Sequence, residues 1–600
     1  MEKQDKLHNI RHSLAHLLAA AVLEIYPETK ITIGPVIENG FYYDFALPAV
    51  ASGGGGISSA LSDKDLPKIE KKMREILKSW DKFERREISG EEAKKLFNGN
   101  QYKLELIDEL GKSGETITVY TSGGFTDLCR GPHVESAKEI PPDAFKLDRL
   151  AGAYWRGDEK NKMLTRIYGL AFESKKELEE YEKMILEAKK RDHRKIGQEL
   201  DLFTFSPLVG PGLPLWTPRG TILRDELNNF VWELRETKGY QKVTIPHITK
   251  KDLYEISGHW AKFAEDLFKI KTREGKEYAL KPMNCPHHTQ IFARRQWSYR
   301  DMPQRYAETT MVYRDEQSGE LGGLTRVLSI TQDDAHVFAR HSQVKEEFFA
   351  IWDIIDTFYK TFNFSLRVRL SFHDPANFDK YLGTKEIWQK AEDALEEIAK
   401  ERKAEYFIAP GEAAMYGPKL DFLAKDSLSR EHQVATVQLD MNMPERFDLT
   451  CINEKGEKER IVMIHCAIMG SIERFTAVLL EHTAGILPVF LSPVQVVVLP
   501  IGEGHQKFAK EIFEELKKNN IRAELNLDNE SLNKKIREFR LRKIPYAIVI
   551  GDKEVESKKL TIETRSGNPA SAKGFGVVKK ENMPAEEFIE KIKKEIQEKK

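Results

Sequence analysis

Three segments decide the fold and the function of this chain: KPMNCPHH (281–288), RYAETTMVYRDEQSGELGGLTRV (305–327) and LSITQDDAH (328–336). Cys285 and His336 lie far apart in sequence but at the ends of two strand-like segments, as two ligands of one metal ion do. Gln332, Asp333 and Asp334 stand where an apolar strand is expected to continue. A strand does not carry so many polar side chains inward without a ligand to satisfy them, so the stretch predicts a binding site.

The middle segment has the composition of a nucleotide-binding loop. Arg314 follows a β-rich run, Glu316 stands two residues later, and the glycine-rich stretch 318–323 comes next. Phosphates are held mainly by positively charged groups, and a loop of small residues lets the backbone come close to a ligand. The segment therefore predicts that Arg314 and its acidic neighbour bind a nucleotide.

Composition limits the classes of protein that this chain can belong to. Its 600 residues are too many for one core, so several domains are expected. The 94 Lys and Arg nearly balance the 95 Asp and Glu, so any nucleic acid must be bound by local basic patches. The four cysteines are too few and too scattered for a disulfide framework, and no apolar run reaches the length of a membrane span. We expect a cytoplasmic protein without a membrane partner.

The N-terminal region contains a second set of possible ligands. His12 and His16 are four residues apart on an expected helix and therefore share one face. Cys129 and His133 are also four apart, on an expected β-hairpin, with Asp127 beside them. The two pairs together make four good metal ligands. They indicate either a zinc site or a metal-free hydrolytic site in which the same side chains position a water molecule.

The rest of the chain alternates between helical and strand-like segments. Residues 172–201 predict one long charged helix that acts as a solvated spacer. The region 202–491 predicts an antiparallel sheet flanked by helices. In its segment EHQVATVQLD (431–440), strict alternation puts Gln433 on one face and Thr436 and Gln438 on the other.

The last hundred residues predict a small, mostly parallel α/β domain, because strands and helices alternate cleanly from about residue 492. This part lacks a glycine-rich nucleotide motif. One of its helices is rich in cations, which make it a candidate phosphate-contacting face or simply a solvated helix. These residues are Lys534, Lys535, Arg537, Arg540, Arg542 and Lys543.

Taken together, these motifs resemble the threonyl-tRNA synthetases, a family of class II aminoacyl-tRNA synthetases. The matching segments cover nearly the whole chain: HSLAHLLAAAV (12–22), GFYYDF (40–45), DLCRGPHV (127–134), KPMNCPHH, VYRDE (312–316), TQDDAHVF (331–338), MYGPKLDF (415–422), TVQLD (436–440), GSIERF (470–475), KIREFRLRKIPY (535–546) and GDKEVESKK (551–559). The resemblance implies an α+β multidomain protein that lacks the small extra N-terminal domain of many bacterial relatives. Its parts would be an α+β editing domain (1–171), a linker helix (172–201), a class II antiparallel-sheet catalytic core (202–491) and an α/β anticodon-binding domain (492–600).

The resemblance also implies a reaction. Threonine is activated with ATP to threonyl-adenylate and transferred to the 3′ end of tRNA(Thr), and mischarged Ser-tRNA(Thr) is hydrolysed in the N-terminal domain. Valine has no hydroxyl group for a metal, so a polar site rejects it. Serine lacks only one methyl group, worth roughly 1–3 kcal/mol, which is too little for accurate translation and creates the need for editing. The implied partners are tRNA(Thr), ATP, threonine and a second copy of the chain, which is expected to meet the first at Pro246 and the helix before it.

Residue roles follow from the same resemblance. The catalytic residues would be Arg314, Glu316, Lys419 and Arg474, with Mg²⁺ accompanying ATP. One Zn²⁺ per chain would be held by Cys285, His336 and His465. The substrate pocket would be lined by Met283, Gln332, Asp334, Tyr416, Gln433, Thr436, Gln438 and Ser471. The editing site would comprise His12, His16, Cys129, His133, Tyr43, Lys103 and Asp127, and in bacterial members the resemblance favours a metal-free pocket. The anticodon contacts would be Asn529, Arg537 and Glu554.

Three residues depart from the pattern of the family. His432 stands where tryptophan is usual, Cys466 follows His465 where a basic residue is usual, and Glu563 stands where arginine is common. The competing interpretations are a synthetase for serine or proline and an RNA-binding regulator without catalysis. The Cys285/His336/His465 set argues against the first. A regulator would be expected to have lost Arg314, Arg474 or a zinc ligand, and all are present.

Overall fold

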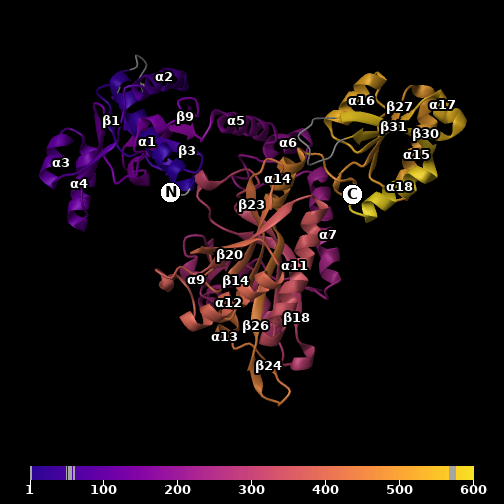
Figure 1. Cartoon of the computed structure of the whole chain (residues 1–600). Coiled ribbons are helices and arrows are strands. Elements are labelled where there is room, and N and C mark those ends of the chain that lie inside the picture. Colours follow the sequence, from indigo (N-terminus) through magenta and orange to yellow (C-terminus); the bar gives the residue numbers. More distant parts are fainter. Residues whose placement is uncertain (1–2, 49, 52–56, 59–60, 567–575) are drawn as a thin grey trace. The chain divides into compact units, whose positions relative to one another are not determined.

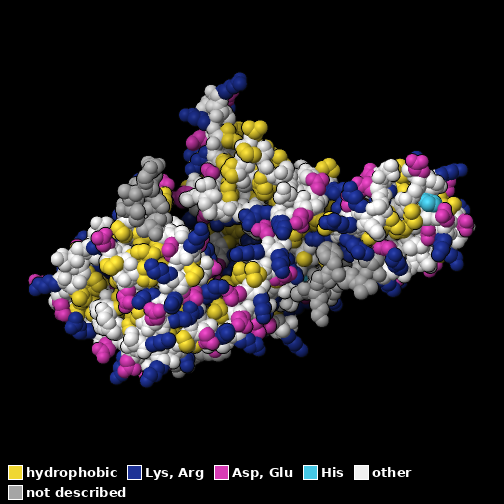
Figure 2. All heavy atoms as spheres, turned by 90° about the horizontal axis from the view of Figure 1, so that it is seen from above, with side chains coloured by type: hydrophobic (Ala, Val, Ile, Leu, Met, Phe, Trp, Pro, Cys, Tyr) yellow, Lys and Arg dark blue, Asp and Glu magenta, His cyan; other side chains and the backbone are white. Residues whose placement is uncertain are grey.

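The computed structural model describes residues 3–48, 50–51, 57–58, 61–566 and 576–600 (Figure 1). The chain divides into two compact units, Met1–Leu186 and Glu187–Lys600. Within the described ranges, none of the helices combines the length and the apolar character that a membrane span requires. Figure 2 shows Lys and Arg side chains mixed with Asp and Glu over the visible face, as the near balance of charges leads one to expect.

The first unit is built from helices, two larger antiparallel sheets and one separate two-stranded antiparallel pair. Its α-helices are α1 (Lys3–Ile25), α2 (Leu66–Leu77), α3 (Gly90–Leu96), α4 (Gln101–Ser113) and the larger part of α5 (Lys175–Lys190). Its strands are β1 (Lys30–Ile31), β2 (Val36–Ile37), β3 (Gly40–Ala46), β4 (Val50–Ala51), β5 (Ile57–Ser58), β6 (Glu84–Glu87), β7 (Thr118–Ser122), β8 (Phe125–Leu128), β9 (Phe145–Tyr154) and β10 (Met163–Ala171). One sheet has the order β1-β3-β10-β9, with β2 also on β3, and a second has the order β6-β7-β8.

Helix α1 is the centre of the first unit. Its run of Ala and Leu residues is buried against β3 and α2, and Leu14, Leu17 and Leu18 are almost fully enclosed. The helix therefore offers a rigid platform on which His12 and His16 are held one turn apart. The predicted helix over this stretch is confirmed.

The second unit begins with the connector and the largest sheet of the described structure. Its α-helices up to residue 483 are α6 (His193–Glu199), α7 (Pro218–Glu236), α8 (Lys251–Ser257), α9 (His259–Lys262), α10 (Cys285–Ala293), α11 (Val344–Thr361), α12 (Lys385–Glu401), α13 (Asn442–Arg446) and α14 (Ile472–Thr483). The strands that form its large sheet are β13 (Gln241–Lys242), β18 (Gln304–Tyr313), β19 (Ser329–Ala339), β20 (Ser365–Phe372), β21 (Tyr406–Pro410), β22 (Lys419–Lys425), β23 (Glu431–Asp440) and β26 (Val462–Ser471). The short strands are β11 (Phe203–Thr204), β12 (Leu215–Trp216), β14 (Ile248–Lys250), β15 (Lys269–Lys271), β16 (Glu277–Leu280), β17 (Trp297–Ser298), β24 (Thr450–Ile452) and β25 (Lys458–Arg460).

The large sheet has the order β13-β18-β19-β26-β23-β22-β20-β21 and is antiparallel except at its two edge pairs. Apolar residues from α7, α11, α12 and α14 form one core cluster with inward residues of the sheet such as Ala335 and Val337. Because side chains alternate along a strand, Asp334 and His336 point to the opposite face. The predicted antiparallel core with flanking helices is confirmed, and Asp334 and His336 lie on the face opposite these four helices, where α10 packs.

The expected single linker helix over 172–201 is wrong in two respects. The structure has two helices, α5 and α6, because Asp192 leaves helical geometry and caps α6 by accepting the N–H of Arg194 at 2.8 Å. Nor is the second half a solvated spacer. Arg191 is 4% exposed and donates to the Ser427 hydroxyl at 2.8 Å, while Ile196 belongs to the main core cluster.

The expected strict alternation along β23 is also wrong. A β-bulge between β22 and β23 pairs Phe422 with Ala435 and Leu423 with Gln433, so Val434 is passed over. The bulge rotates Gln433 onto the face that carries Thr436. Both side chains consequently reach the same acceptor, as described below.

The C-terminal part of the second unit is a mixed α/β domain. Its strands are β27 (Val496–Pro500), β28 (Ala523–Leu525), β29 (Tyr546–Ile550), β30 (Lys559–Ser566) and β31 (Gly576–Pro584), and its α-helices are α15 (Gln506–Lys518), α16 (Leu532–Leu541), α17 (Asp552–Ser557) and α18 (Ala585–Gln597). The sheet order is β28-β27-β29-β30-β31, with parallel pairs at β28-β27 and β27-β29 and antiparallel pairs beyond. The α/β prediction is confirmed, with the correction that β30 and β31 run antiparallel to their neighbours.

Candidate functional site

The predicted zinc ligands meet on the face of the large sheet that lies opposite α7, α11, α12 and α14. His336 on β19 and His465 on β26 are direct cross-strand partners, and their rings lie 4.7 Å apart. Cys285 opens α10, so it is positioned by the first turn of a helix and not by a strand end as expected. One ligand atom from each of the three side chains lies within 4.8 Å of the others, and all three residues are buried.

Two further residues hold the imidazoles in place. His465 Nε2 lies 2.8 Å from Asp440 Oδ2, and His336 Nδ1 lies 2.7 Å from His288 Nδ1. A partner on one ring nitrogen fixes the orientation and leaves the other nitrogen for a metal. Sequence reasoning missed these roles, although His288 stands three residues after Cys285 on the same helix, a spacing that could have indicated it.

The set fits a zinc ion in its chemistry. Burial raises the pKa of the Cys285 thiol well above its usual value and lowers the pKa of His336. The His336 imidazole is therefore neutral, as a metal ligand must be, and a bound cation would stabilise the Cys285 thiolate that burial disfavours. One thiol and two imidazoles make a donor set typical of zinc with an open position.

A cavity of about 100 Å³ joins this set to most of the predicted substrate residues. The predicted residues that line it are Met283, Cys285, Arg314, Gln332, Asp334, His336, Tyr416, Thr436, Gln438 and His465. Asp334 accepts the Asn284 amide at 2.9 Å, and the Tyr416 hydroxyl donates to Gln438 at 2.6 Å. Among the described residues, Gln332 Oε1 and Arg314 Nε are buried without a hydrogen-bond partner. Such atoms indicate that a ligand completes the site.

The predicted residues outside the cavity surround it. The Glu316 carboxylate accepts a hydrogen bond from the Arg326 guanidinium at 2.8 Å. The Ser471 hydroxyl donates to Glu473 at 2.9 Å and caps α14 by accepting the backbone N–H of Arg474. Cys466 also lines the cavity, but its Sγ lies 3.6 Å from the Tyr240 hydroxyl, and His432 lies 3.0 Å from Asp426. The Cys466 thiol is therefore turned toward a core residue on α7's side of the sheet, and it is not part of the Cys/His/His set.

Asp333 serves the fold and not the ligand. Its buried carboxylate accepts three backbone N–H groups, from Ile468, Met469 and Gly470, at 2.8–3.1 Å. It also lies 3.5 Å from Arg235, which donates to the Asp333 carbonyl at 2.7 Å. The carboxylate thus fills the irregular step where β19 and β26 change register, and this step brings Gln332 opposite Ser471.

Asp421 is the residue that organises the other half of the pocket. It is fully buried on β22 and accepts Gln433 and Thr436 on one oxygen, at 3.0 and 2.9 Å. Its other oxygen accepts Ser371 and Arg369 at 2.7 and 3.0 Å and lies 3.3 Å from Lys419 Nζ. Sequence reasoning did not assign it a role, because its partners come from three different strands.

An Asp421→Asn variant is expected to lower activity at this site by about ten- to hundredfold, the cost typical of losing an outer-shell partner. An asparagine offers one acceptor and one NH₂ group, which would face donors that the carboxylate now satisfies. Steady-state ATP–pyrophosphate exchange measures the effect, with Asp448→Asn as the control, because Asp448 forms an exposed pair with Arg460. Equal rates in both variants would contradict the organising role.

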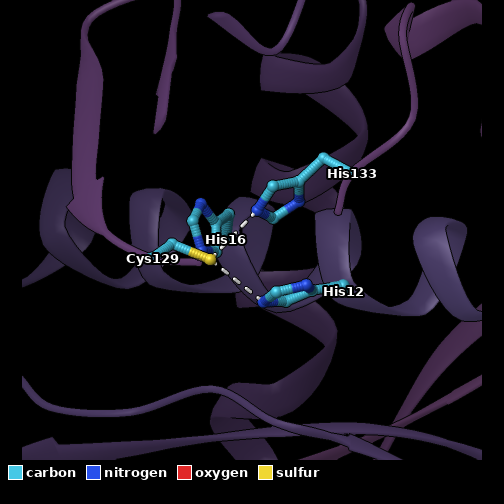
Figure 3. Close-up of side chains that lie close together, drawn as sticks. All are labelled: His12, His16, Cys129 and His133. Atoms are coloured by element: carbon cyan, nitrogen blue, oxygen red, sulfur yellow. Dashed lines mark hydrogen bonds between the residues drawn. The ribbon is translucent and has the colours of Figure 1, made fainter. Parts of the chain in front are cut away.

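In the first unit the structure brings together all seven predicted editing residues. The His12, His16, Cys129 and His133 side chains converge, with one ligand atom from each within 4.8 Å of the others (Figure 3). Cys129 Sγ lies 3.2 Å from His12 Nε2 and 3.3 Å from His133 Nε2. Ser13, which sequence reasoning missed, lies 3.1 Å from the other ring nitrogen of His133.

A buried polar triad lies behind this cluster. Lys103 and Asp127, both at most 2% exposed, are 2.5 Å apart, and the Tyr43 hydroxyl donates to the second Asp127 oxygen at 2.5 Å. That oxygen also lies 3.8 Å from His16 Nε2. The triad connects α4, β8 and β3 to the histidine helix.

Burial keeps the cluster uncharged. It lowers the pKa of His12, His16 and His133 below the usual value and raises the pKa of the Cys129 thiol to about 12. At neutral pH the site therefore offers neutral imidazoles and a thiol, not a thiolate nucleophile. Such a set can hold a metal ion or accept a proton from a water molecule.

The predicted anticodon residues lie in the C-terminal domain. Arg537 is exposed on α16 and lines a hollow of about 530 Å³ with Arg540, Glu563 and Lys580. Glu554 caps α17 by accepting the Gly551 N–H at 2.8 Å, and Asn529 is exposed.

The expectation that the whole cationic set of the α16 region faces phosphates is wrong for Lys535. That residue is 4% exposed and donates to the carbonyls of Pro500 and Asn526. Glu563 is buried and pairs with Lys580 across the strands at 2.7 Å.

Comparison with known proteins identifies three regions. Residues 268–483 match the tRNA synthetase class II core domain (G, H, P, S and T). Residues 495–595 match the anticodon binding domain, and residues 117–168 match the threonyl and alanyl tRNA synthetase second additional domain.

Full-length relatives and solved structures agree with these matches. The chain is 50% identical over 560 residues to the threonine–tRNA ligase of Porphyromonas gingivalis, covering 92% of this chain and 84% of the relative. It is 48% identical over 565 residues to that of Deinococcus radiodurans, covering 93% and 85%. The solved structure titled as the RNA binding domain of threonyl-tRNA synthetase from Cryptosporidium parvum aligns with a TM-score of 0.63 at 37% identity, covering 67% of this chain and 98% of that one.

Proposed function

This chain belongs to the threonine–tRNA ligases, and we propose that it forms threonyl-adenylate in the cavity around Cys285, His336 and His465. The observation that carries the proposal is the buried Cys/His/His set next to Asp334 and two polar atoms without a partner. A synthetase for serine or proline is disfavoured, because the relatives at about 50% identity are threonine–tRNA ligases.

In this proposal the three buried residues hold one zinc ion per chain. A zinc ion on this set would supply open coordination positions for the amino and hydroxyl groups of threonine. Asp334, fixed by Asn284, then accepts a hydrogen bond from the substrate. Valine cannot offer a hydroxyl group here and is rejected, whereas serine can enter.

ATP is bound on the same face by positively charged side chains. Adenylate formation is an in-line displacement at phosphorus, so catalysis needs cations near the phosphates more than it needs an acid or a base. Arg314 lines the cavity, Lys419 is oriented by Asp421, and Arg474 stands in the first turn of α14. We assign these residues to the phosphates, Glu316 to the adenine side, and Mg²⁺ to the bound ATP.

The cluster on α1 then removes serine from mischarged tRNA. We propose a metal-free pocket, because the Cys129 thiol is already satisfied by hydrogen bonds with His12 and His133. The neutral imidazoles are suited to take a proton from the attacking water, and Lys103, Asp127 and Tyr43 set the shape and charge of the pocket wall.

The remaining assignments complete the picture of a cytoplasmic homodimer. The four cysteines are unpaired, as in a reducing compartment. We assign the dimer interface to α7 and Pro246, beside which in sequence Leu208 is 98% and Ile248 51% exposed. Asn529, Arg537 and Glu554 are assigned to the anticodon of tRNA(Thr). We place the editing domain at 1–171, the connector at 172–201, the catalytic core at 202–491 and the anticodon domain at 492–600.

Amino-acid-dependent ATP–pyrophosphate exchange tests the proposal. The chain is expected to exchange with threonine, more weakly with serine and not with valine, because only valine lacks the hydroxyl group. Metal analysis is expected to return one zinc per chain, not two, since only the Cys285 set is assigned a metal. Absence of threonine-dependent exchange would favour a non-catalytic RNA-binding regulator, and exchange with proline alone would favour the other synthetase.

A further inference from the structure

His193, a buried residue at the start of the connector helix α6, contacts the segment 318–327, which is the predicted nucleotide-binding loop. His193 is 5% exposed, and its Nε2 accepts the backbone N–H of Leu324 at 3.1 Å. Its Nδ1 lies 2.8 Å from Glu481 Oε1 on α14, which also accepts the His193 backbone N–H at 3.2 Å. Because a carboxylate only accepts, Nδ1 carries the proton and Nε2 is the free acceptor that Leu324 uses.

The loop is shaped to fit this histidine. A Cβ atom on Gly323 would lie 2.4 Å from His193 Nε2, and Gly323 has a φ of +58°, so only glycine suits the position. The Leu324 side chain is 0% exposed and belongs to the same core cluster as Ile196 and Leu200 of the connector region. The hydrogen bond to His193 thus anchors the loop backbone on α6, while the Leu324 side chain is buried in the core.

The anchored segment is connected through Arg326 to Glu316, the residue assigned above to the adenine side of ATP. Arg326 stands two residues after Leu324. Its carbonyl accepts a hydrogen bond from the Gly322 N–H at 3.1 Å, and its guanidinium donates to Glu316 at 2.8 Å. Glu481, the other partner of His193, lies on α14, the helix whose first turn holds Arg474. His193 therefore stands between the two segments that carry the ATP residues.

We propose that His193 is a positioning residue for adenylate formation, which fixes the Glu316/Arg326 loop and α14 to the connector helix. The proposal rests on the assignment of these segments to ATP. Asp192, His193 and Glu481 are close enough to suggest a metal site. That alternative fails because each group is already engaged, with Asp192 capping α6, both His193 nitrogens bonded and Glu481 paired with Arg430 at 2.7 Å.

Two substitutions separate the two hydrogen bonds. In His193→Asn the side-chain amide can reproduce the donor at Nδ1 but has nothing at the position of Nε2. In His193→Gln the side chain reaches the position of Nε2 with an oxygen and loses the donor to Glu481. Lys195→Asn on the exposed side of α6 is the matched control, since Lys195 Nζ has only a 4.0 Å contact with Glu199.

The experiment measures hydrogen exchange of the loop amides and the KM values in ATP–pyrophosphate exchange on the full-length chain. His193→Asn is expected to speed exchange of the Leu324 amide and to raise the KM for ATP about three- to tenfold, the cost of one hydrogen bond, with the KM for threonine changed less than about twofold. His193→Gln is expected to keep the Leu324 amide protected and to raise the KM for ATP by less. Unchanged Leu324 protection in His193→Asn, or equal changes in both KM values, would overturn the proposal. Loop protection is read without substrate, so it stands apart from a failure of the wild-type chain to exchange with threonine.

Discussion

Replacing Cys285 by serine is expected to abolish zinc binding by the catalytic core and to lower threonine-dependent exchange by more than about a hundredfold. Loss of an outer partner alone costs about ten- to hundredfold, and Cys285 is one of only three proposed protein ligands. The thiol is 2% exposed, so water cannot simply replace it. Metal content per chain and the rate of exchange measure the two effects.

Cys451→Ser is the matched control for this variant. Cys451 is also buried, in β24, and belongs to the same packing cluster as Cys285, but it is not one of the three converging ligands. It should keep its zinc and most of its exchange rate. A Cys285→Ser protein that retains one zinc and normal exchange would remove the basis for threonine recognition at this site.

The second large effect is expected from Lys103→Met in the editing unit. Removing the lysine leaves Asp127 as a buried charge without its cation, which costs about 3–5 kcal/mol. Native-state hydrogen exchange of α1 and β3 amides in the full-length chain would measure the loss as a lower free energy of opening. Hydrolysis of Ser-tRNA(Thr) should fall sharply, while threonine-dependent exchange in the other unit stays normal.

The double variant Lys103→Met/Asp127→Asn separates stability from chemistry. With both charges removed, no ion is left unpaired, and replacing a buried pair is often nearly neutral for folding. Opening free energies should recover most of the loss, whereas hydrolysis of Ser-tRNA(Thr) should stay low. Recovery of hydrolysis together with stability would show that the pair supports only the fold.

Sequence reasoning identified the parts of each site that stand in short motifs. His12 and His16 share a helix face because four residues make about one turn, and the structure confirms this. The wrong prediction for Gln433 shows the limit, because a bulge depends on the partner strand and leaves no trace in a two-residue pattern.

The missed residues are those that act through contacts between distant segments. Asp421 collects donors from β20 and β23, Asp440 of β23 reaches His465 of β26, and His288 of α10 reaches His336 of β19. The motif around Gln332 suggested three ligand-facing residues, yet Asp333 binds backbone N–H groups of β26. Polar residues in a strand indicate that hydrogen-bond partners are needed, but the register of the sheet decides which partners these residues find.

The pairing of His336 with His465 across β19 and β26 has a consequence for how such a gene can change. Loss or gain of one codon inside either strand would slide the register by one residue and turn one imidazole into the apolar layer beneath the sheet. Point substitutions can drift through these strands, but length variation must be confined to the connecting loops. The strand pairing therefore constrains the length of both strands more strictly than it constrains their sequence.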